Sequence, residues 1–65
     1  MRKGDKIEFR CHQGSKRWTE TETFIRKGRY HGRAVLYVLE DGDEDHQLMV
    51  ELSEVLKVNG EMVSK

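Results

Sequence analysis

The chain has 65 residues with one Cys and no Pro, and its twelve Lys and Arg residues balance twelve Asp and Glu residues. This length supports one small domain over residues 1–65. It excludes a deep interior for a large cofactor, because so short a chain buries only about 60% of its unfolded surface. The charges are sorted along the chain: residues 1–33 hold ten bases and four acids, a formal charge of +6, and residues 34–65 carry −6.

Turn-forming residues divide the chain into short segments, which predicts an all-β protein. The first strand is expected over residues 6–12, where Ile7, Phe9 and Cys11 alternate with polar residues. This period of two places the three apolar side chains on one face of the strand. Cys11 is therefore predicted to be a small buried side chain that continues the face of Ile7 and Phe9.

The second strand is expected over residues 17–27. Its Thr-Glu-Thr-Glu-Thr run favours strand through the Thr residues, but Glu20 and Glu22 share their parity with Trp18 and Phe24. A straight strand would put two carboxylates beside two aromatic rings. We therefore expect a bulge or strong bend here, or a first half that lies outside the core.

The third strand is expected over residues 33–40. Its residues 34–39 are apolar on both faces, which is typical of a central strand. A polar hairpin loop over residues 41–46, with Asp41-Gly42 as its turn, leads to a fourth strand over residues 47–51.

Residues 52–55 favour one turn of 3₁₀ helix, started by Ser53, and residues 55–58 favour a short last strand. A helix over residues 48–57 is the alternative, because the apolar residues there also fit helical spacing, but the valines and the missing end cap favour the strand. The structured part is expected to cover residues 4–58 and to be followed by a tail over residues 59–65. The predicted core consists of Ile7, Phe9, Phe24, Leu36, Val38, Leu48, Val50 and Val55.

Five short strands with a 3₁₀ turn before the last describe an SH3-like barrel. Residues 4–9, Gly-Asp-Lys-Ile-Glu-Phe, resemble the opening of Tudor and Agenet domains, and Trp18 resembles the Trp that opens their second strand. Residues 35–42 resemble their third strand and acidic turn, and residues 52–56 resemble their closing segment. The resemblance covers residues 4–58 and implies a small five-stranded SH3-like barrel of the Tudor, Agenet or KOW type.

The resemblance implies a binding function. Tudor-type readers enclose a methylated Lys or Arg with several aromatic rings. Phe9, Phe24 and Tyr37 are expected in the core here. The two remaining rings, Trp18 and Tyr30, would make a poor cage for a methylated side chain. Bacterial and phage proteins with this fold, including KOW-type modules, mostly bind nucleic acid or other proteins, which suits the charge pattern better.

The leading hypothesis is a non-catalytic nucleic-acid-binding module, such as a small phage or bacterial regulator of transcription or chromosome state. If the first three strands are neighbours, their basic ends form one face where cations neutralise phosphates and aromatic rings stack on bases. The loop expected over residues 27–33 is the main predicted contact, because Gly28 and Gly32 allow close backbone approach. The choice between DNA and RNA stays open, and solubility is the simpler reading of the same charges. The predicted site residues are Arg10, Lys16, Arg17, Trp18, Arg26, Lys27, Arg29, Tyr30 and Arg33.

The second hypothesis is a protein-interaction module, either a Tudor-like reader or an inhibitor of a host protein. In this case Asp41, Asp43, Glu44 and Asp45 hold the partner, or the chain forms a homodimer. These acids do not match a calcium loop, because the Gly and the final Glu are misplaced. As a solvated hairpin tip they are expected to tolerate neutralisation.

No metal, cofactor or enzymatic activity is expected. The only soft ligands, Cys11, His12, His31 and His46, lack the close pairs of zinc sites. There is no nucleophile elbow and no Gly-rich phosphate loop before a helix. Residues 47–50 lack the Tyr of the strand that plasmid-type dihydrofolate reductases use. With no signal peptide and no apolar run of membrane-spanning length, we expect a cytoplasmic protein, in the host cytoplasm if a phage encodes it.

Overall fold

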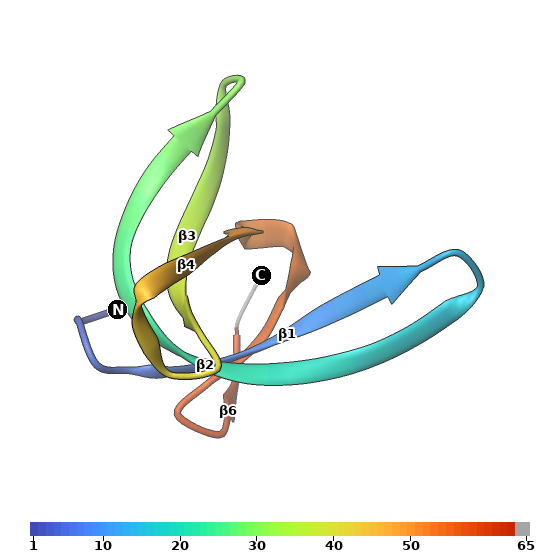
Figure 1. Ribbon diagram of the computed structural model, residues 1–65, viewed down its shortest axis with the longest axis horizontal. Coiled ribbons are helices and arrows are strands. Elements are labelled where there is room, and N and C mark those ends of the chain that lie inside the picture. Colours follow the sequence, from blue (N-terminus) through green and yellow to red (C-terminus); the bar gives the residue numbers. More distant parts are fainter. Residues whose placement is uncertain (64–65) are drawn as a thin grey trace.

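The computed structural model describes residues 1–63, which form one six-stranded antiparallel sheet (Figure 1). In chain order the elements are β1 (Lys6–Gln13), β2 (Lys16–Tyr30), β3 (Arg33–Glu40), β4 (Asp43–Glu51), the 3₁₀ turn η1 (Leu52–Glu54), β5 (Val55–Val58) and β6 (Glu61–Met62). The strand order across the sheet is β4-β3-β2-β1-β5-β6. The predicted all-β class and the 3₁₀ turn before β5 are confirmed.

The number of strands and the shape of the sheet differ from the prediction. A sixth strand lies in the predicted tail, whose residues 64 and 65 fall outside the described part of the chain. The sheet is open, with β4 and β6 as its edges. The alternative helix over residues 48–57 is wrong, because these residues continue from β4 through η1 into β5. Within residues 1–63 no helix is long and apolar enough to cross a membrane.

Tight turns make the hairpins longer than predicted. Type I′ turns need positive φ at both central residues and match the right-handed twist of the flanking strands. Three residue pairs in the structure have this property: His31-Gly32, Asp41-Gly42 and Asn59-Gly60. Because such turns leave no loop, the loops predicted over residues 27–33 and 41–46 are wrong outside these pairs, and most of their residues lie in strands. The predicted Asp41-Gly42 turn is confirmed.

The 3₁₀ turn begins differently from the prediction. Glu51 occupies the position before η1 and makes no side-chain cap. Ser53 lies inside the turn, and its hydroxyl donates to Glu51 Oε2 at 3.5 Å. The starting role predicted for Ser53 is therefore wrong.

β2 takes part in two different pairings. Its residues 16–23 pair with β1, and from Phe24 onward it pairs with β3. The register shifts between Phe24 and Arg26, which places a bulge at Ile25 and confirms the predicted irregularity. The bulge follows the acidic run, so it does not separate the carboxylates from the apolar face: Glu20 lies opposite Phe9.

The two pairings send two hairpin ends in different directions (Figure 1). We call residues 10–19, the blue and cyan end of β1 and β2, the first arm. We call residues 26–34, the green end of β2 and β3, the second arm. A bulge bends a strand and increases its local twist, so the irregularity at Ile25 accounts for the divergence of the arms.

The core lies where the arms meet. Seven of the eight predicted core residues are buried there: Ile7, Phe9, Phe24, Leu36, Val38, Val50 and Val55. The prediction for Leu48 is wrong in degree, because Leu48 is half-buried and packs against this cluster. Cys11 and Tyr37 are likewise half-buried rather than core. Val35 is buried on the opposite face of β3 from Leu36, as befits a central strand.

Candidate nucleic-acid interface

The first arm carries four of the predicted site residues: Arg10, Lys16, Arg17 and Trp18. A two-residue turn joins Gln13 to Lys16, and the pairing sets Cys11 opposite Trp18 and His12 opposite Arg17. Because side chains alternate between faces along a strand, Arg10 and Arg17 lie on one face and Trp18 on the other. Trp18 itself is 43% exposed.

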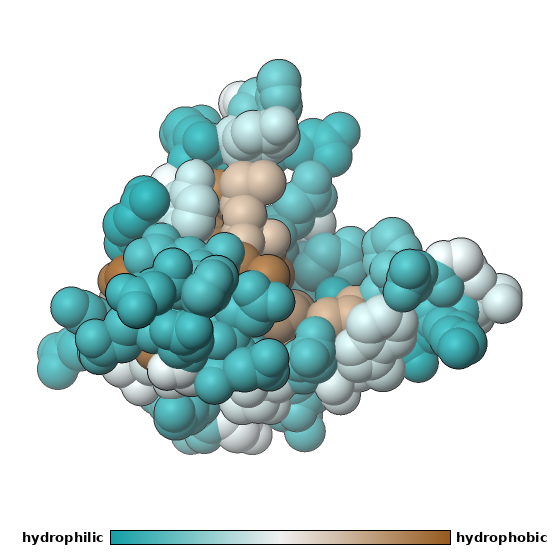
Figure 2. Space-filling model, viewed as in Figure 1, coloured by the Kyte–Doolittle hydropathy of each residue, from teal (hydrophilic) through white to brown (hydrophobic). Residues whose placement is uncertain are grey.

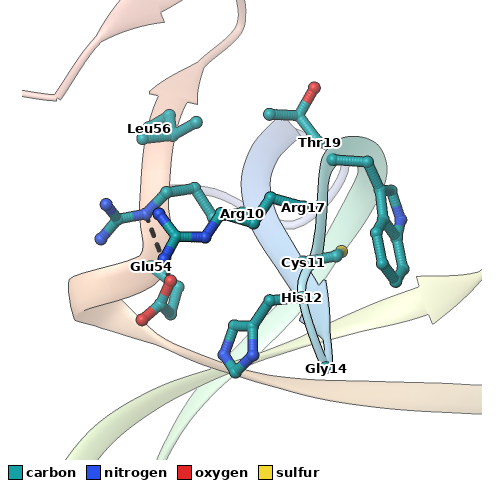
Figure 3. Close-up of a pocket in the computed structure, with 9 residues that line it drawn as sticks. Arg10, Cys11, His12, Gly14, Arg17, Thr19, Glu54 and Leu56 are labelled. Carbon is teal, nitrogen blue, oxygen red and sulfur yellow. Dashed lines mark ion pairs between the residues drawn. The ribbon is translucent and has the colours of Figure 1, made fainter.

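A pocket of about 580 Å³ lies beside this arm, and Glu54 and Leu56 close it on the opposite side. Figure 3 shows the side chains of Arg10 and Arg17 extending toward Glu54. Arg10 Nε forms an ion pair with Glu54 Oε2 at 3.2 Å, and Arg10 Nη2 donates to the Ser53 carbonyl at 3.2 Å. The charge of Arg10 is therefore engaged within the chain.

The second arm carries the other five predicted site residues: Arg26, Lys27, Arg29, Tyr30 and Arg33. Pairing to β3 places Arg26 opposite Tyr37 on one face, and Lys27 opposite Leu36 on the other. The Arg26 guanidinium lies 3.9 Å from the centre of the Tyr37 ring, and Arg33 Nη1 pairs with Glu51 Oε1 at 3.2 Å. Neither side chain is available as an uncommitted cation.

The single basic face predicted from the sequence is divided between the two arms. Each arm keeps two cations without an intramolecular partner, because within residues 1–63 the side chains of Lys16, Arg17, Lys27 and Arg29 form no hydrogen bond or ion pair. Each arm also exposes one aromatic ring, Trp18 at 43% and Tyr30 at 52%. The Tyr30 and His31 rings form a T-shaped contact, with centres 4.2 Å apart.

Three carboxylates lie together between the arms, a cluster that the sequence did not predict. Oxygens of Glu20, Glu22 and Asp41 all lie within 4.8 Å of one another. Glu22 Oε2 also accepts the Asp41 backbone N–H at 2.9 Å. The unusual parity of Glu20 and Glu22 was visible in the sequence, but their approach to Asp41 depends on the fold. This negative charge repels phosphate from the junction of the arms and leaves their ends as the cationic surface.

The acids predicted to hold a protein partner lie at the β3–β4 turn and along β4, an edge strand. Asp43 Oδ1 accepts the Asp45 N–H at 2.9 Å, and its Oδ2 lies 2.7 Å from His46 Nδ1. The amide hydrogen bond, followed by that of His46, lowers the pKa of Asp43. Charged residues on an edge strand hinder pairing with other strands, so these acids also protect the sheet edge.

An apolar groove separates the first arm from β4. Its volume is about 450 Å³, and its floor includes Phe9, Cys11, Leu48 and Val50. Figure 2 shows hydrophobic residues lining the hollow between the arms, while the arms themselves are hydrophilic. The rim of the groove includes the carboxylates of Glu20, Glu51 and Glu54.

Cys11 is expected to react slowly with alkylating reagents. Partial burial, the hydrogen bond from Cys11 Sγ to Glu20 Oε2 at 3.1 Å and the charge of Glu20 raise the thiol pKa from 9.0 to about 11. Since the thiolate is the nucleophile, iodoacetamide at pH 8 should modify Cys11 about 100-fold more slowly than an unperturbed thiol. The folded state binds the thiol proton more tightly than the unfolded chain does, so this proton stabilises the fold below about pH 9. The stabilisation should be lost as pH rises from about 9 to about 11.

Glu20→Gln provides the matched comparison for the reactivity of Cys11. It removes the negative charge but keeps the shape, so the thiol pKa should fall and alkylation should become faster. Equal rates in the two proteins would show that Glu20 does not control the thiol.

Comparison with known proteins yields no relative: no family model, curated protein or solved structure matches this chain.

Proposed function

We propose that this chain is a small SH3-like domain that binds nucleic acid without catalysis, through the ends of its two arms. The observation that carries the proposal is the shared composition of the arms. Each has two cations without a partner among residues 1–63, and each has one exposed aromatic ring. Cations supply sequence-independent affinity for phosphates, and aromatic rings stack on unpaired bases.

The SH3-like assignment is supported by the connectivity. A long strand, β2, is shared between two hairpins, a 3₁₀ turn precedes β5, and β5 pairs with β1. In this proposal the rest of the sheet positions the arms and takes no direct part in binding. The type I′ turn at His31-Gly32 keeps the end of the second arm narrow, and a two-stranded ribbon of this kind fits the major groove of B-DNA.

Salt dependence is the first test. Binding of the chain to short random-sequence duplex and single-stranded DNA should weaken steeply with added NaCl, because each neutralised phosphate releases a counterion. Four available cations predict a slope of about −3 to −4 for log K against log [NaCl] on the duplex. Absence of binding to either DNA at low salt would contradict the proposal and would leave the charge asymmetry to a protein partner.

Arg29→Ala and Tyr30→Ala separate the two kinds of contact on the second arm. Arg29→Ala should weaken binding to all sequences and reduce the magnitude of the salt slope by about one. Tyr30→Ala should cost about 1–3 kcal/mol of binding free energy, with the larger loss on single strands. Lys3→Ala is the control, since Lys3 is exposed and lies outside both arms. If Arg29→Ala and Tyr30→Ala bind like the control, the second arm is not the contact.

A further inference from the structure

The apolar groove between the first arm and β4 is unsuited to nucleic acid. Glu20, Glu51 and Glu54 line its rim. Arg33 pairs with Glu51 and Arg10 pairs with Glu54, which leaves Glu20 as the rim carboxylate without an ion pair among residues 1–63. At its Glu20 end the groove meets the carboxylate cluster of Glu20, Glu22 and Asp41, which forms no ion pair with any cation among residues 1–63. A polyanion is repelled here, whereas a basic side chain with an apolar neighbour complements the surface.

The molecule also exposes more surface than a compact monomer of its mass. Its accessible surface is 5058 Å² for a mass of 7.7 kDa, whereas a folded monomer of that size exposes about 4300 Å². The difference is close to the roughly 800 Å² that each partner buries in a standard-size interface. Two diverging arms (Figure 1), and a groove between the first arm and β4, are the features that depart from a compact shape.

We propose that a second copy of this chain occupies the groove, so that two copies exchange their second arms around a two-fold axis. The charge sorting supports this occupant, because the chain carries both halves of the match: the acidic, apolar groove and a basic arm with an exposed aromatic ring. In the dimer Tyr30 packs on the apolar floor. Arg29 leaves the opposite face of the arm, so its long side chain reaches over the rim to Glu20 and the neighbouring carboxylates. A buried aromatic side chain and an arginine are the residues that most often dominate interface energetics.

Two-fold symmetry makes both junctions identical. Each copy provides one arm and one groove, so the contact closes on itself and growth stops at two chains. The dimer occupies Arg29 and Tyr30, so it competes with nucleic acid for the second arm. The first arm remains outside the contact, and its cations Lys16 and Arg17 stay available. The dimer does not depend on nucleic acid, and its test is made without it.

Sedimentation equilibrium of the full chain in low-salt buffer tests the proposal. Between about 1 µM and about 1 mM, the range of weak to moderate association, the mass should rise from 7.7 kDa to about twice that value. Added NaCl should weaken the dimer through screening of the Arg29–Glu20 contact. A wild-type chain that stays monomeric throughout this range overturns the proposal.

Charge exchange identifies the contact. Arg29→Glu and Glu20→Arg should each raise the dissociation constant about 100-fold, because each places like charges together. In an equimolar mixture the intact arm of one variant meets the intact groove of the other, and the second junction carries the same pair with its signs reversed. The mixture should therefore form a heterodimer where each variant alone is monomeric.

Two further variants keep the test decisive. Glu20→Gln removes the charge with little change of shape, and Tyr30→Ala removes the aromatic contact; both should weaken the dimer even if Glu20→Arg fails to fold. Lys16→Glu, on the first arm, is the matched control and should leave the dimer unchanged. A dimer that survives Arg29→Glu, Glu20→Gln and Tyr30→Ala, or that is lost in Lys16→Glu, uses a different surface and overturns the proposal.

Discussion

Leu36→Ala is expected to lower the free energy of unfolding by about 2–5 kcal/mol. Leu36 is 2% exposed at the centre of β3, opposite Val50 of β4 and Lys27 of β2. Shortening its side chain removes apolar contacts and leaves a cavity that surrounding strands fill only in part. Since a small domain is stable by only about 5–15 kcal/mol, urea unfolding should show a large shift of the midpoint.

Leu52→Ala is the control for Leu36→Ala. Leu52 is 42% exposed in η1, so the same truncation there should change stability by about 0.5 kcal/mol or less. An unfolding curve for Leu36→Ala that matches the control would contradict the central position of β3 in the core.

Gly28→Ala is expected to destabilise the second arm by about 1–3 kcal/mol, because overpacking forces a side chain out of place. A Cβ added at Gly28 would lie 2.6 Å from Cε2 of Tyr37, closer than two non-bonded carbon atoms can approach. The Tyr37 ring must move, and the Arg26 guanidinium that lies over it loses that contact. Strand propensity alone would predict the opposite sign, since Gly is unfavourable within a strand.

A double-mutant cycle isolates this packing effect. In a Tyr37→Ala background the ring is absent, so Gly28→Ala should cost much less or become stabilising. The coupling energy should be about 0.5–3 kcal/mol, as is found for residues in contact. Additive effects in urea unfolding would mean that Tyr37 does not cover Gly28.

Much of the fold could be predicted from local patterns. The alternation of Ile7 and Phe9 identified the buried face of β1, and the apolar run of β3 identified a central strand. The hairpins extend further than the sequence predicts, because the polar residues after Gly28 and Gly42 have the composition of loops. Composition does not distinguish a loop from an exposed antiparallel strand with one or both faces in water. The type I′ turns make these residues strands, because a two-residue turn pairs the residues on either side of it.

The candidate site was predictable in composition but not in arrangement. The sequence identified the nine residues that the arms carry, and charge sorting indicated a polyanion or a charged partner. Sequence separation does not reveal which cations are already paired: Arg10 meets Glu54, and Arg33 meets Glu51. Sequence separation also gives no sign that Glu22 lies beside Asp41, because this contact crosses from one hairpin to another.

Residue type and a period of two along the chain are enough to predict the strand class, most of the core and the segregation of charge. Two features follow only from the folded sheet: the basic residues occupy two diverging arms, and an acidic, apolar groove lies beside one of them. Both arise from the bulge at Ile25, where β2 stops pairing with β1 and pairs with β3 instead. Where a strand changes partner is set by the packing of the whole sheet rather than by the residues of that strand.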